Sequence, residues 1–229
     1  MWFSISEIIL GARRAPDRRV ALSASIGGYC VEAGRCTDIC RNMMRSLFGP
    51  PRTGGEGRWR YEARLIHTER WTRPVVVYHC YGGSHTSVVS AALHLGWLPR
   101  SAPPCREDLE FVRAFDSLES RIGQIHHLGR DRRGVEVKAV GLGGARAVLW
   151  PLYLQLMEVA GWSREEIIGC HTLPAAGPVL RVGGFLSVRL GLTWPGRPLV
   201  IWGVRRAHPE LVRYVEGVER RLDALPPSS

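Results

Sequence analysis

Residues 74–99 constrain the fold of this chain most, because they read as a strand, a glycine loop and a helix in direct succession. Residues 75–78 are β-branched or aromatic, which is typical of a strand buried on both faces of a parallel sheet. The pair Gly82-Gly83 follows, and glycine lets a backbone fold tightly around a bound group. An apolar helix is expected over residues 88–98. A strand–loop–helix unit of this kind predicts an α/β fold.

The loop between this strand and this helix is a candidate anion site. Thr86 or Ser87 can cap the helix, and the N–H groups and dipole of a helix N-terminus attract negative charge. A lysine-free loop can still hold a phosphate through its backbone N–H groups. The predicted ligand-binding residues of the loop are Gly82, Gly83, Ser84, Thr86 and Ser87. In the competing interpretation, the two glycines only allow the strand and the helix to pack closely.

From residue 75 onward, expected strands alternate with expected helices. Expected helices cover residues 106–119, 145–160, 178–190 and 208–222; a hairpin covers 121–130 and 134–141; further core strands cover 167–173 and 199–204. This order predicts a three-layer α/β fold, with a mostly parallel sheet and helices on both of its faces. Ligands of such sheets bind where the strands end at their carboxyl side.

That edge would bring several reactive side chains together. Cys80 is a candidate nucleophile, and His85 and His171 are candidate acid–base groups. The further ligand-binding candidates are Thr172, Arg181, Arg205 and Arg206. Each has a plainer alternative: a small buried thiol for Cys80 and a solvated pair of charges for the two adjacent arginines. The interruption of a helix at Gly183-Gly184 is interpreted as close packing of that helix against the sheet rather than as a ligand contact.

Residues 1–73 differ from the rest of the chain. Their apolar pieces are short and broken by Gly, Pro and Arg, and residues 51–58 look like a linker. We therefore expect an irregular N-terminal extension over 1–73 and one α/β domain over 74–225. The extension lacks a continuous apolar face that could offset its backbone entropy. It is expected to contribute little to the stability of the domain, and valine codons at 75–77 are candidates for the natural start.

Composition limits the classes of partner. The net charge is +10, but 13 of the 31 basic residues precede residue 75, so nucleic acid is not an expected partner of the main domain. We expect no membrane span, because the most apolar stretch, 147–162, is short and interrupted by polar residues. Six cysteines without a secretory signal indicate reduced thiols and a cytoplasmic protein.

No metal site is predicted. The spacing of Cys30, Cys36 and Cys40 does not match the usual zinc pairs. The adjacent residues at 79–80 and at 170–171 point to opposite faces of their strands, so their four side chains do not converge easily. The sequence does not indicate a cofactor.

The loop and two later segments together resemble a known family. An H-C-[aromatic]-G-G-x-H-[ST]-S loop at 79–87, a helix ending H-L-G-x-L-P at 94–99, a T-L-P turn at 172–174 and an R-[IV]-G-G-F-L-S segment at 181–187 resemble the bacterial "domain of unknown function 3189" family. The resemblance covers about residues 75–222 and implies the fold and the place of the site. The activity of that family is uncharacterised.

The same loop has a looser likeness to the H-C-x5-R-[ST] signature of protein tyrosine phosphatases. His79, Cys80, Gly83 and Ser87 are in register, but Thr86 stands at the position of the arginine. Binding of a phosphorylated or otherwise anionic small ligand is therefore expected. The protein would be a hydrolase or a transferase that uses Cys80 as its nucleophile. The alternative is a non-catalytic ligand-binding or regulatory module that uses the same site.

Overall fold

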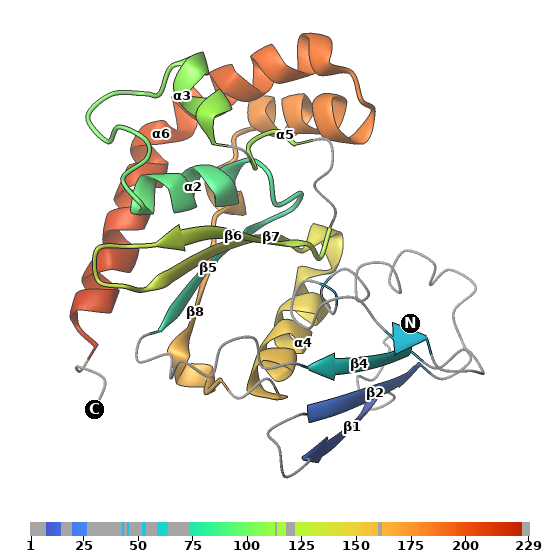
Figure 1. The fold of residues 1–229 in the computed structure, drawn as a ribbon. Helices are drawn as coiled ribbons and strands as arrows, with labels where there is room; N and C mark the ends of the chain where they lie inside the picture. The colour runs from blue at the N-terminus through green and yellow to red at the C-terminus, as the bar shows by residue number, and fades with distance from the viewer. Residues whose placement is uncertain are drawn as a thin grey trace.

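A sheet of four strands forms the centre of the computed structural model, which describes residues 8–14, 20–26, 43, 45, 52–53, 59–63, 74–112, 114–117, 122–159 and 162–225 (Figure 1). Its strands are β5 (Val75–Cys80), β6 (Ile125–Arg130), β7 (Glu136–Gly141) and β8 (Ile167–His171). They lie in the order β6-β7-β5-β8. β5 runs parallel to both of its neighbours, and only β6 is antiparallel. The predicted mostly parallel sheet is therefore confirmed.

Five described helices and four short helical turns accompany this sheet. The helices are α2 (Thr86–His94), α3 (Arg106–Phe111), α4 (Arg146–Val159), α5 (Pro178–Gly184) and α6 (Thr193–Asp223). The turns are η2 (Gly143–Ala145), η3 (Arg164–Glu166), η4 (Leu173–Ala175) and the π-helical η5 (Phe185–Arg189). Among the helices in these ranges, none is long and apolar enough to cross a membrane.

The strand β5 is buried along its whole length, because helices cover both faces of the sheet. Val76 and Tyr78 belong to one core, which contains residues of α2, α5 and α6. Val75 and Val77 point the other way and join a second core formed with α4. Figure 1 shows α2, α5 and α6 on one side of the sheet and α4 on the other. The predicted three layers are confirmed.

The prediction of a strand at residues 199–204 is wrong, because this segment lies inside α6. Val200, Val204 and Leu211 are buried at helical spacing in the same core as Leu180 of α5. A Cβ at Gly203 would lie 2.7 Å from the Cβ of Leu180. A run of six mostly apolar residues fits a buried strand and a buried helix equally well. Close packing against α5 selects the helical conformation of this segment.

Two expected helices differ in extent. The helix expected over 106–119 ends at Phe111, where Val112 turns to an extended conformation. The helix expected over 178–190 is not interrupted at its glycines: α5 continues into η5. A Cβ at Gly183 would lie 2.7 Å from the backbone nitrogen of Val200. This glycine therefore serves close packing of two helices, whereas the sequence predicted packing of a helix against the sheet.

Four strands are described before residue 74: β1 (Ile8–Arg14), β2 (Val20–Ile26), β3 (Arg52–Thr53) and β4 (Trp59–Ala63). They form an antiparallel sheet of their own, in the order β1-β2-β4-β3. The broken periodicity of this region did not predict these regular strands. Met43 is fully buried in the core on the α4 side. The cysteines at 30, 36 and 40 lie outside the described residues, and the division of the chain at residue 73 stays a prediction.

Candidate functional site

Cys80 ends the central strand, and the loop that follows folds back over its sulfur. The backbone N–H of Gly83 donates to Cys80 Sγ at 3.1 Å. The hydroxyl Oγ of Ser87, in the first turn of α2, lies 3.1 Å from the same sulfur. The structure thus brings together three residues that sequence analysis placed in one site.

The loop can make this turn because of its glycines. Gly83 has a φ of +81°, in the left-handed region that side-chain-bearing residues rarely adopt. The carbonyl groups of Cys80 and Tyr81 accept hydrogen bonds from the N–H groups of Leu142 and Gly143. The loop is therefore tied to the chain that leaves β7, and close packing of strand and loop accounts for part of the glycine requirement.

Ser84 is a buried polar residue of the loop whose hydroxyl has no hydrogen-bond partner among the described atoms. A Cβ at Gly82 would lie 3.7 Å from this Oγ, so the hydroxyl lies within the curl of the loop. The first turn of α2 carries no acidic side chain. Its N-cap residue is His85, not Thr86 or Ser87 as the sequence predicted, and it makes no side-chain capping bond. The N-terminal N–H groups of a helix have no partner inside the helix, so this end of α2 is suited to a negative group.

Thr172 joins the end of β8 to the start of α2. Its Oγ1 lies 3.0 Å from Thr86 Oγ1 and 3.2 Å from the carbonyl oxygen of His79. Both threonines are fully or almost fully buried. Their hydroxyl groups are thus committed to holding α2 against the sheet. The structure places them beside the loop, where sequence analysis expected ligand-binding groups.

His85 contacts a buried carboxylate that the sequence analysis did not identify. His85 Nε2 donates to Asp116 Oδ1 at 2.9 Å. The other oxygen, Asp116 Oδ2, accepts from Ser187 Oγ at 2.9 Å and from Arg197 Nε at 3.1 Å. Burial by itself would raise the pKa of Asp116. The hydrogen bonds from His85, Ser187 and Arg197 together outweigh burial, so the pKa lies below its ordinary value. Asp116 is thus a carboxylate that neutral or cationic donors surround.

Asp116 has a φ of +46°, and its N–H donates to the carbonyl of Ser84. This contact attaches the 114–117 segment to the glycine loop. On the other side of His85, a Cβ at Gly184 would lie 2.7 Å from the imidazole Cε1. The imidazole is therefore held between Asp116 and α5. No local pattern signals Asp116, Ser187 or Arg197, since they lie 31 to 81 positions from their partners.

His171 lies away from Cys80, because its ring stands on the α4 face of the sheet. It stacks on His79, with ring centroids 5.1 Å apart, and Trp150 of α4 stacks on the same ring of His79. Burial lowers the pKa of His79 to about 3, with smaller contributions from His171 and Arg146. Burial also lowers the pKa of His171. Both imidazoles are therefore neutral at pH 7, and the prediction of His171 as a partner of Cys80 does not fit this placement.

The two stacked imidazoles do not form a metal site. Their planes are inclined by only 19°, and nitrogen lone pairs lie in the ring planes, so nearly parallel stacked rings cannot both point at one ion at bonding distance. Within the described residues, no group of three or more metal-binding side chains is found.

The three predicted arginines lie in different places. Arg181 Nε donates to the carbonyl of Ala176 at 2.8 Å, next to the turn that carries Thr172. Arg205 donates to the carbonyl of Pro104, and Arg206 lies over the ring of Trp202. The last two are exposed on α6. They do not stand at the end of a strand, because the strand that would have put them there is a helix.

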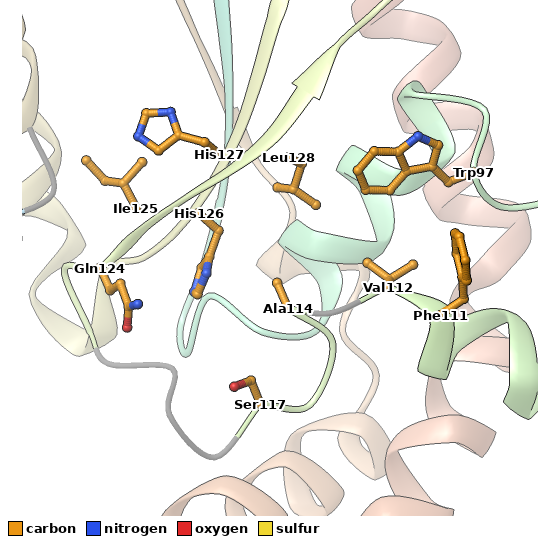
Figure 2. Close-up of a pocket in the computed structure, with 10 residues that line it drawn as sticks. All are labelled: Trp97, Phe111, Val112, Ala114, Ser117, Gln124, Ile125, His126, His127 and Leu128. Atoms are coloured by element: carbon orange, nitrogen blue, oxygen red, sulfur yellow. The ribbon is translucent and has the colours of Figure 1, made fainter. Parts of the chain in front are cut away.

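A hollow of about 740 Å³ lies beside the site, and sequence analysis did not predict it. Its walls come from β6, the 114–117 segment, the end of α3 and Trp97 (Figure 2). The side chains of Ser117, Gln124 and His126 line one part of it, and the rings of Trp97 and Phe111 line another.

Comparison with known proteins places the chain in a family. The model of the family described as "Protein of unknown function (DUF3189)" matches residues 75–220, which is more than half of the 229-residue chain. No curated protein matches the chain, and no solved structure does. The matched region begins with β5 and ends within α6, and it contains the glycine loop and its partners. The chain therefore belongs to the DUF3189 family.

Proposed function

We propose that the loop of residues 80–87 binds a phosphorylated or otherwise anionic small molecule, and that Cys80 acts on it as a nucleophile. One observation carries this proposal. The sulfur of Cys80 lies under a loop whose Gly83 N–H and Ser87 hydroxyl both contact it, at the N-terminus of α2.

Charge and hydrogen-bonding capacity support the binding of an anion. The N-terminal end of α2 carries positive partial charge, and the first turn holds no acidic residue that would offset it. The buried Ser84 hydroxyl, which has no partner among the described atoms, can donate to an anion oxygen. The phosphatase-like register of the loop stays a likeness, since Thr86 replaces the arginine. Arg197, partly exposed and bound to Asp116, is the cation of this cluster.

The chemistry proposed for Cys80 is group transfer. The thiolate sulfur forms a bond to phosphorus, and the bond from phosphorus to the ester oxygen breaks. The departing oxygen takes up a proton, for which His85, paired with Asp116, is the proposed source. Water in a hydrolase, or an acceptor hydroxyl in a transferase, then attacks the phosphorus of the cysteinyl phosphate and gives its proton to His85. The phosphorus–sulfur bond breaks and returns the Cys80 thiolate.

A second candidate function is a non-catalytic binding module. It is favoured by the burial of the loop: Cys80 is 6% exposed, and Ser84 and Ser87 are fully buried. A sulfur so enclosed can contribute to the shape of an anion site without reacting. The two functions share the site and differ in turnover.

Binding and turnover separate these possibilities. The wild-type protein should show saturable binding of inorganic phosphate by calorimetry. Ser84→Ala should weaken that binding about tenfold, because it removes a hydrogen bond to a charged group. Cys105→Ser, which changes a half-exposed thiol on another loop, should have no effect. Hydrolysis of p-nitrophenyl phosphate that is lost in Cys80→Ser supports the nucleophile, and binding without hydrolysis supports the module. If neither phosphate nor sulfate binds, the anion site is refuted.

The proposed location is the cytoplasm. Cys80, Cys105 and Cys170 are free thiols in the structure, as expected where thiols stay reduced. That nucleic acid is not a partner remains a prediction.

A further inference from the structure

The hollow beside the glycine loop has the position, size and lining of a site for a second part of the same ligand. It measures about 740 Å³, within the range of small-molecule sites and larger than a phosphate group needs. This inference rests on the proposed function, because the loop supplies the place of the anionic group.

Two backbone connections join the hollow to the loop. On one side, Gly141 touches Gly82: a Cβ on Gly141 would lie 2.5 Å from the carbonyl carbon of Gly82. The carbonyl of Gly141 accepts from Gly123 N–H at 2.7 Å, directly before Gln124 of the hollow. On the other side, Asp116 N–H donates to Ser84, directly before Ser117 of the hollow. The polar part of the hollow therefore adjoins the loop.

The opposite part of the hollow is aromatic. Phe111 is 76% exposed and Trp97 is 44% exposed, although both residues are large and apolar. Figure 2 shows their two rings together on one side of the hollow, with Ser117, Gln124 and His126 on the other side. Exposed aromatic rings that line a hollow next to polar groups are typical of sites for flat ligands.

Among the described residues that line the hollow, there is no Asp, Glu, Lys or Arg. Burial lowers the pKa of His126, so its imidazole is neutral at pH 7. An uncharged group suits the described part of these walls, because a charge there would lose hydration without gaining an ion-pair partner. The amide of Gln124, the imidazole of His126 and the hydroxyl of Ser117 contain both donors and acceptors.

We propose that the hollow binds the base of a nucleotide whose phosphate occupies the loop of residues 80–87. A nucleobase is planar, uncharged and edged with hydrogen-bonding groups. Its faces can stack on Trp97 or Phe111, and its edge can contact Gln124 and His126. The sugar of the nucleotide would span the Gly141 and Asp116 connections.

The test compares ligands that differ only in the base. Calorimetry with the full chain should show that at least one of AMP, GMP, CMP and UMP binds about tenfold tighter than ribose 5-phosphate. In Phe111→Ala the ratio of the two affinities should fall toward one. Phe111 is largely exposed, so this variant is expected to fold. Trp202→Ala removes an exposed aromatic residue of α6 that is not part of the hollow, and should keep the wild-type ratio.

The outcomes separate this inference from the proposed function. Equal affinities of ribose 5-phosphate and all four nucleotides would overturn the base site and leave the anion site intact. If neither inorganic phosphate nor ribose 5-phosphate binds, the anion site is refuted. Binding of the uncharged nucleosides then tests whether the hollow binds a base. Nucleoside binding that Phe111→Ala removes would support the hollow by itself. No nucleoside binding would overturn it.

Discussion

Gly83 and Gly141 lie so close together that a Cβ on Gly83 would come within 2.4 Å of the backbone nitrogen of Gly141. The first residue belongs to the loop after β5, and the second ends the neighbouring strand β7. Two backbones without side chains thus meet at the carboxyl edge of the sheet. This contact fixes the loop that covers Cys80.

We expect Gly83→Ala to destabilise the protein by about 2–5 kcal/mol, because the new methyl group strains a left-handed residue and also meets backbone atoms that cannot move freely. The measurement is urea unfolding. Gly96→Ala is the matched control, since Gly96 also has a positive φ (+73°) but nothing within 4 Å of its Cβ position. It should cost only the conformational strain, about 1–2 kcal/mol. Equal losses in the two variants would contradict the close contact.

His79 should make the stability of the protein depend on pH. Its pKa is about 3 in the folded state, against an ordinary value of 6.5, because burial disfavours the cation. The unfolded chain therefore binds a proton first as the pH falls below 6.5, and stability is lost in that direction. Between pH 7 and pH 5 this residue should account for about 2 kcal/mol of lost unfolding free energy.

His79→Phe keeps a flat ring beside Trp150 and His171 but cannot titrate, so this part of the pH dependence should vanish. Urea unfolding at pH 7 and pH 5 measures it. The control is Tyr153→Phe, which alters another ring stacked on Trp150. Burial raises the pKa of Tyr153, so its phenol is neutral throughout the range, and this variant should keep the wild-type dependence. An unchanged dependence in His79→Phe would show that His79 is not the source.

Cys80 should react with iodoacetamide roughly tenfold faster than Cys105 or Cys170 at pH 6.5, as expected of a nucleophilic thiol at a helix N-terminus. Burial raises the pKa of Cys170 to about 12. A hydrogen bond with Asp108 raises the pKa of Cys105. Peptide mapping by mass spectrometry gives the three rates. Slower labelling of Cys80 than of Cys105 would assign it a structural role.

Met43→Ala tests whether the region before residue 74 is part of the folded unit. Met43 is fully buried beside residues of β5 and α4, so its truncation should cost about 2–5 kcal/mol. Arg45→Ala changes an exposed residue nearby and should cost less than about 0.5 kcal/mol. A negligible loss in Met43→Ala would agree with the prediction that the domain does not need its N-terminal extension.

Local sequence was sufficient for the central unit of the fold. The β-branched run of β5 and the loop and helix behind it are consecutive, and each has a preference that its neighbours reinforce. The hairpin of β6 and β7 could be predicted for the same reason. The segment at 199–204 could not, since its run of apolar residues satisfies strand and helix patterns alike. Only the approach of Gly203 to Leu180 in the folded protein selects the helix.

The candidate site also has one part that local sequence determines and another that depends on tertiary packing. Cys80, Gly83 and Ser87 lie within eight positions of one another, so the turn of the chain alone brings them together, and the sequence by itself determined this part. Asp116, Ser187 and Arg197 come from segments up to 81 positions apart. Tertiary packing of α5 and α6 against the loop decided their meeting at His85, as it decided the hollow, and it also put His171 on the far face of the sheet. Contacts between distant segments depend on which faces bury together, and no short stretch of sequence contains that information.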